Sequence, residues 1–189
     1  MNLTLFAAGT FGELPWYIVR VAGFVAVALL VLLILTGIGR VTGVIYRFVE
    51  PLKTWALHKT LAIALAATIV LHVGFLVFRP ETTESHTFSF QKLAMAAGVL
   101  ATWLMAAIIL SSAGFFRKKL KLWRAVHLSS YATVVLVFIH ALGVGTDLRG
   151  GWARTAWIFT GVAVALAVAV RLIQMLTGRR EKPKKISKR

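Results

Sequence analysis

Cysteine is absent from this sequence of 189 residues, and acidic residues are scarce, with six Asp and Glu against 22 Lys and Arg. The lack of cysteine excludes disulfides, iron–sulfur clusters held by thiolates, and haem attached covalently through thioether bonds. Any bound metal must therefore be held by histidine, methionine, tyrosine or carboxylate side chains. Residues 1–15 contain no Lys or Arg and no compact apolar run, so we expect no secretory signal peptide.

Apolar residues are abundant: they make up 59% of the chain, and the mean hydropathy is +0.81. A soluble domain is about half apolar, and a chain of this size cannot bury so much apolar surface within itself. Lipid is therefore expected to cover much of it. The net charge of +16 is concentrated between apolar runs and at the C-terminus. Anionic lipid and membrane topology explain that placement better than a nucleic-acid partner does.

The apolar residues form runs that are each long enough to cross a bilayer as a helix. They predict an all-α integral membrane helix bundle of about five transmembrane helices, with a basic tail after the last one. The runs cover approximately residues 16–37, 53–78, 92–116, 123–145 and 152–177.

The distribution of positive charge predicts how these spans are oriented. Lys and Arg gather after the first and third runs and in the tail, whereas the other two loops and the N-terminus are not basic. The N-terminus is therefore expected outside and the C-terminus inside, in a bacterial inner (plasma) membrane. We divide the chain into an exposed N-terminal lead-in (1–15), a transmembrane domain (16–178) and a basic cytoplasmic tail (179–189).

Four of the five histidines lie inside two of the runs, where a charge-capable side chain is costly and usually functional. The second run contains His58 and His72, and the fourth contains His127 and His140. Both runs cross from inside to outside, so His58 matches His127 in depth and His72 matches His140. Within each run the separation is about 20 Å at a helical rise of about 1.5 Å per residue. Facing helices can thus supply two His–His pairs, each able to bind one haem iron from both sides.

The fourth run raises a question of geometry. Thirteen residues leave His127 and His140 about 140° apart on an ideal helix, whereas the histidines of the second run share a face. Either the helix is overwound or bulged between them, or the two haems approach it from different sides. Ser129, Ser130 and Gly143 could accommodate a distortion, because serine can hydrogen-bond back to the helix backbone.

Three basic residues near these pairs are candidate partners for haem propionates. Lys59 and Arg124 lie near the inner pair, and Arg20 lies near the outer pair. Each can equally be an interfacial anchor, and for Arg20 the simpler interpretation is snorkelling to the headgroups. His86 is a lone histidine in a polar loop; it could bind a metal, but a histidine in such a place is usually solvated, and its role stays open.

The two histidine spacings, H-x13-H and H-x12-H, resemble those of the ferric reductase-like transmembrane domain family. The segment Trp16–Arg40 looks like the opening helix of that family, with Arg20 and Gly23 in the expected places. The segment Leu57–Val73 resembles the first haem helix of the family, and Trp123–His140 resembles the second. The superfamily includes ferric reductases, NADPH oxidases and the haem-binding membrane subunit of a methionine sulfoxide reductase system.

The resemblance covers approximately residues 16–178 and implies two b-type haems that move electrons across the membrane. Many members have six spans and end in a cytoplasmic flavin and nicotinamide domain. Here we count five spans, and about eleven residues follow Gly178, fewer than the ~30 of a βαβ unit. We therefore expect an oxidoreductase, or the membrane subunit of one, that takes electrons from quinol or a separate flavoprotein. Quinone or flavin would then be supplied by a partner.

The electron acceptor stays open among ferric iron, dioxygen and a periplasmic redox enzyme. The basic inner loops suit an acidic cytoplasmic reductase as well as lipid. A haem-free transporter or proton channel that uses the histidines as a relay is the alternative function, and it predicts a colourless protein. A scaffold subunit of a larger complex is a third hypothesis.

Overall fold

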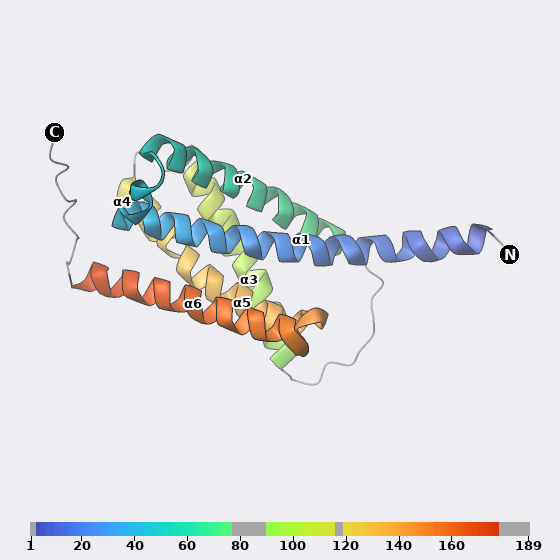
Figure 1. Cartoon of the computed structure of the whole chain (residues 1–189). Coiled ribbons are helices and arrows are strands. Elements are labelled where there is room, and N and C mark those ends of the chain that lie inside the picture. Colours follow the sequence, from blue (N-terminus) through green and yellow to red (C-terminus); the bar gives the residue numbers. More distant parts are fainter. Residues whose placement is uncertain (1–2, 77–89, 116–118, 178–189) are drawn as a thin grey trace.

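The structure, a computed structural model of the chain, describes residues 3–76, 90–115 and 119–177, with side chains within 14–76, 90–113 and 119–177. Every regular element in these ranges is a helix (Figure 1). His86 and the tail 179–189 lie outside the described residues. The elements are α1 (Leu3–Thr42), η1 (Val44–Arg47), α2 (Pro51–Leu76), α3 (Phe90–Leu110), η2 (Ser111–Phe115), α4 (Leu120–Leu128), α5 (Ser130–Val144), η3 (Thr146–Leu148) and α6 (Gly151–Leu176).

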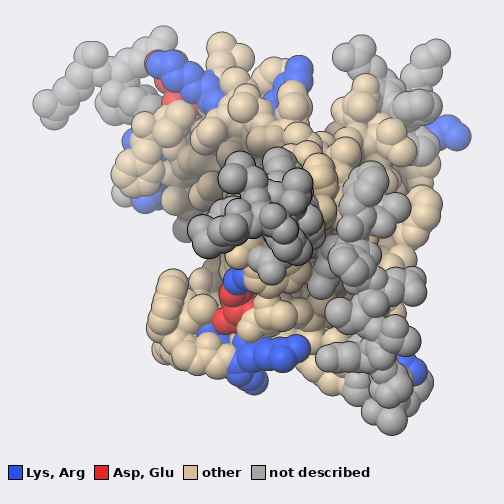
Figure 2. All heavy atoms as spheres, turned by 90° about the vertical axis from the view of Figure 1, so that its right-hand side faces the viewer, with Lys and Arg blue, Asp and Glu red and all other residues tan. Residues whose placement is uncertain are grey.

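The predicted all-α membrane bundle is confirmed, because five stretches of the described residues are long and apolar enough to cross a membrane. Figure 2 views the molecule from the end that lies on the right of Figure 1, where Lys, Arg, Asp and Glu side chains appear among mostly uncharged residues. The five stretches are Leu14–Thr42, Pro51–Leu76, Phe90–Ala113, Leu120–Val144 and Gly151–Leu176.

The first span extends beyond its predicted ends. Helix α1 begins at Leu3, so most of the segment predicted as a separate lead-in is continuous with the span, and Pro15 lies within the helix. At the other end Gly43 adopts φ 78°, a left-handed conformation that favours glycine and turns the chain out of α1. The short helix η1 follows, and α2 then begins at Pro51. Proline suits that position because the first turn of a helix needs no backbone N–H donor.

The spans are arranged as two packed pairs. Helix α2 lies mainly against α1, and α3 lies mainly against α5, while α1 also touches α5 and α6. Within the described ranges the backbones of α2 and α5 hardly approach each other. Only 6% of the apolar stretch of α2 is buried inside the protein, against 28% for that of α1. Helix α2 is therefore held from one side.

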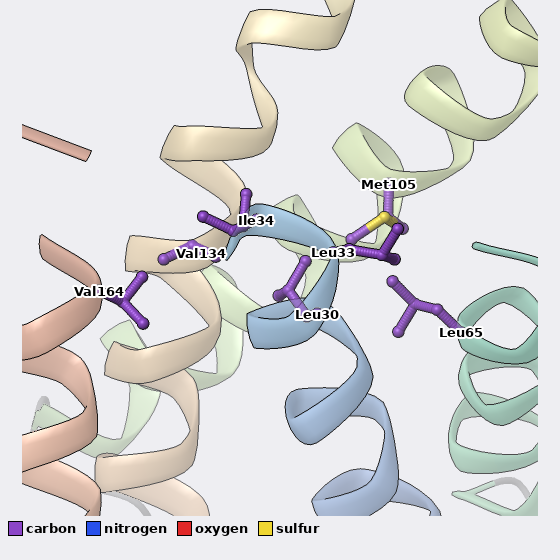
Figure 3. Close-up of a cluster of buried hydrophobic side chains, with 7 residues drawn as sticks. All are labelled: Leu30, Leu33, Ile34, Leu65, Met105, Val134 and Val164. Carbon is purple, nitrogen blue, oxygen red and sulfur yellow. The ribbon is translucent and has the colours of Figure 1, made fainter. Parts of the chain in front are cut away.

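A layer of buried apolar side chains joins all five spans at the middle of the bundle (Figure 3). Leu65 lies seven residues from each histidine of α2, and Val134 lies seven residues after His127 and six before His140. The layer is therefore about 10 Å along the helices from the histidines on either side. It consists of Leu30, Leu33, Ile34, Leu65, Met105, Val134 and Val164.

Candidate functional site: two facing histidine pairs

The structure brings the four intramembrane histidines together as the two predicted pairs. His58 of α2 faces His127 of α4, with ring centres 6.4 Å apart and planes at 50°. His72 of α2 faces His140 of α5, with ring centres 6.3 Å apart and planes at 89°. We call these the inner pair and the outer pair, following the predicted topology. Almost the same separation thus recurs at two depths of the bundle.

A break in the fourth span places both of its histidines toward α2. Helix α4 ends at Leu128 and α5 begins at Ser130. At the junction the backbone N–H of Ser129 donates to the carbonyl of Val126 at 3.1 Å, and the Ser129 hydroxyl donates to the same carbonyl at 2.6 Å. A bond to the third preceding residue is the 3₁₀ pattern, which winds more tightly than an α-helix. Of the two alternatives for this span, the structure shows the local distortion.

Backbone carbonyls fix the rings of the outer pair. The Nδ1 atom of His72 bonds the carbonyl of Val19 at 2.8 Å, and the Nδ1 of His140 bonds the carbonyl of Ala94 at 3.0 Å. A carbonyl can only accept, so both Nδ1 atoms donate a proton and each Nε2 has the lone pair. Metal-binding histidines usually show this arrangement, because the outer hydrogen bond sets the tautomer and the ring orientation.

The inner pair has different surroundings. The Nδ1 of His58 lies 3.1 Å from the hydroxyl of Thr36, which donates to the carbonyl of Leu32 at 2.8 Å and so accepts from the histidine. The Nδ1 of His127 is buried and has no hydrogen-bond partner in the described part of the chain. The ring of Trp123 stacks on His127 with centres 5.1 Å apart.

The separation within each pair fits one metal ion shared by two imidazoles. A metal about 2 Å from each ligating nitrogen, with roughly 1 Å more to each ring centre, places the ring centres about 6 Å apart. Two imidazoles are the protein ligands that a six-coordinate haem iron needs, because the porphyrin supplies four nitrogens. Among the described residues, no group of three or more His, Cys, Asp or Glu side chains gathers to hold a bare metal ion.

Glycines on neighbouring helices make room for three of the four rings. A Cβ atom at Gly23 of α1 would lie 3.2 Å from ring atoms of His72, and one at Gly37 would lie 3.6 Å from Cε1 of His58. These glycines are fourteen residues apart, as are the two histidines of the antiparallel helix α2. On α3, a Cβ at Gly98 would overlap the ring of His140.

The structure shows other contacts for two of the three predicted propionate partners and an exposed position for the third. Arg20 forms an ion pair with Asp147 of η3, with Nε–Oδ2 at 2.9 Å, and its guanidinium lies 4.0 Å from the ring centre of Trp16. Lys59 is exposed, with its Nζ 5.5 Å from the ring centre of Trp55. Arg124 is exposed on α4.

Two charged residues of this region were missed by the sequence reasoning. Asp147 had one usable signal, because it is the sole acid between the fourth and fifth runs. Arg40 lies one turn beyond Gly37 on α1, and Gly37 packs against the ring of His58. The Nε of Arg40 is buried and has no hydrogen-bond partner among the residues described. The sequence has no signal that singles out Arg40, because the contact between Gly37 and His58 depends on tertiary packing.

The fold and the site define a five-span membrane protein with two stacked pairs of facing histidines. Residues 22–138 match the family model described as ferric reductase like transmembrane component, and the chain belongs to this family. The matched segment contains three of the four intramembrane histidines and ends two residues before the fourth, His140. The resemblance drawn from the sequence is thereby confirmed. Members of this family usually bind haem, and a component of this kind indicates electron transfer across the membrane. No curated protein and no solved structure matches the chain.

Proposed function

We propose that this protein moves electrons across the membrane through two b-type haems, one at the inner pair and one at the outer pair. The observation that carries the proposal is the repeated ring-centre separation of 6.4 and 6.3 Å, which suits one shared metal ion in each pair. Haem supplies one-electron chemistry when it is bound. The iron ligands are His58 and His127 at the inner site and His72 and His140 at the outer site.

The residues around the pairs support this role by holding the rings in place. The carbonyls of Val19 and Ala94 and the hydroxyl of Thr36 orient three of the rings with Nε2 available to a metal. The backbones of α2 and α5 make few contacts, so the two helices that supply the outer pair are not packed directly against each other. Glycines behind the rings let them sit deep against the helices.

The direction of transfer follows from the predicted topology. With the N-terminus outside, electrons enter at the inner site from quinol or a separate flavoprotein and leave at the outer site. A membrane potential that is negative inside favours this by about 2.3 kcal/mol per 100 mV for a full crossing. The acceptor is ferric iron, dioxygen or a periplasmic redox enzyme. In a bacterial inner membrane, the basic connections would lie where a cytoplasmic reductase or anionic lipid can contact them.

The alternative, a haem-free relay of protons or substrate through the histidines, is less well supported. A relay needs polar groups or water between successive titratable side chains. Between the two pairs the bundle has the buried apolar layer, in which Leu65 is 3% and Val164 is 2% exposed. That layer suits electron transfer, which needs no polar path.

The proposal is tested by a reduced-minus-oxidised absorption spectrum of the purified full chain, with the extracted haem quantified. About two b-type haems per chain are expected, both six-coordinate. His58→Ala or His127→Ala should disturb one haem, and His72→Ala or His140→Ala the other. His86→Ala is the matched control and should leave both unchanged. The absence of a Soret band after expression with ample haem would overturn the proposal.

A further inference from the structure

The two pairs differ in the strength of the hydrogen bonds that the Nδ1–H groups of their histidines donate to the protein. In the outer pair both Nδ1 atoms donate to backbone carbonyls, at 2.8 and 3.0 Å. In the inner pair His58 donates to a hydroxyl at 3.1 Å, and His127 has no acceptor among the described residues. The carbonyl is the stronger acceptor, so the outer imidazoles are the more electron-rich ligands.

The pairs also differ in the charge beside them. Near the outer end, the cation of Arg20 is balanced by Asp147. Near the inner pair, Arg40 lies one turn along α1 from Gly37, which packs against His58. The Nε of Arg40 is buried and has no hydrogen-bond partner in the described ranges. Arginine stays protonated in proteins. The inner pair therefore has a nearby positive charge that no described carboxylate pairs with.

Both differences act in the same direction on a reduction potential. An electron-rich imidazole stabilises the oxidised iron and lowers the potential, whereas a nearby cation stabilises the added electron and raises it. The outer pair has the more electron-rich imidazoles, and the inner pair has the nearby cation.

We propose that the inner pair is the higher-potential site, set by Arg40 and by the weak Nδ1 hydrogen bonding, so that outward transfer is uphill in intrinsic potential and is driven by the membrane voltage. This inference rests on the proposed function. The electron lost at the inner site is the one gained at the outer site, and no bond or proton changes place. Quinol or a flavoprotein supplies each electron, and the outer acceptor removes it. Without voltage, a single electron resides on the inner site.

The test is an equilibrium redox titration of the haem-loaded full chain in detergent, where no voltage exists. Two components are expected. Arg40→Gln should lower the midpoint of the higher-potential component only, by at least tenfold in its reduction equilibrium constant, which is 59 mV for one electron. Thr36→Val removes the acceptor of His58 and should raise the same component by a smaller amount. The two variants should therefore shift the midpoint of the same component in opposite directions. A general loosening of the fold would not produce opposite shifts.

Two controls complete the design. Arg47→Gln removes an exposed cation from η1 and should shift neither component. Arg40→Lys keeps the positive charge, so the midpoint potential of the higher-potential component should stay close to the wild-type value. This variant can still be titrated if Arg40→Gln loses the inner haem. The inference is overturned if the protein binds two haems but Arg40→Gln shifts the midpoint of the lower-potential component, of both components equally, or of neither. The proposed function would remain intact in that case. A wild-type protein without haem would overturn the proposed function itself.

Discussion

Single glycine residues determine how deeply the histidine rings sit between the helices. The clearance differs among them: a Cβ would overlap the ring of His140 at Gly98, would press on His72 at Gly23, and would make ordinary contact with His58 at Gly37. A methyl group at these positions therefore has a graded effect on the rings. The outer site is the more constrained of the two.

Gly98→Ala is expected to displace His140 and break its hydrogen bond to Ala94, because the new methyl group occupies the space of the ring. We predict that bound haem falls from about two per chain to about one, with the inner component retained. Extracted haem and the low-temperature spectrum of each component measure this.

Gly74→Ala is the matched control, because nothing lies within 4 Å of a Cβ at that position of α2. It should leave both haems in place. Full haem content and an unchanged spectrum in Gly98→Ala would show that the ring of His140 is not held where the structure places it.

At the scale of the helices, the ion pair between Arg20 and Asp147 ties α1 to the connection between α5 and α6. Both side chains are about one-third exposed, at 32% and 30%, so solvent screens the attraction. We predict that Asp147→Asn lowers the free energy of unfolding in detergent by about 1 kcal/mol. Arg20→Gln should cost a similar amount, and the double variant little more than either alone.

A double-mutant cycle measured by thermal unfolding quantifies this coupling. The haem spectrum gives a separate reading of the propionate role that the sequence suggests for Arg20. If the role of Arg20 is only structural, the spectrum of the outer haem should be the same in all three variants as in the wild type. Additive losses of stability in the cycle would contradict the ion pair.

The helices also show where the sequence is informative. The five spans were predictable because hydropathy is a local property, and so was the pairing of His58 with His127, since depth follows from position along a helix. The sequence left two alternatives for the fourth span and could not decide for the break at Ser129. The choice depends on the direction in which His127 and His140 face, and that is set by tertiary packing. Asp147 and Arg40 depend on tertiary packing between distant segments, which a single sequence does not show.

The whole molecule is held together at its middle layer, since that is where all five spans meet. Leu65→Ala should destabilise the protein by about 1–2 kcal/mol, because it opens a cavity where packing rather than water exclusion drives helix association. Both haem components should broaden, since the layer lies between the pairs. Ile63→Ala removes a similar side chain that is 62% exposed on the same helix, and it should have little effect.

Unfolding in detergent and the width of each redox transition measure both variants. Equal losses of stability in the two variants would show that Leu65 contributes nothing beyond its contact with the surrounding amphiphile.

The apolar layer between the two pairs also has an electrical consequence. Electrons can tunnel through buried leucine, valine and methionine side chains, but protons need a chain of polar groups, which this layer does not provide. In the proposed topology an electron therefore crosses without a proton beside it. Each crossing discharges the membrane by one elementary charge, as much as the entry of one proton would. The cell would thus spend part of its proton-motive force on every electron that it exports by this route.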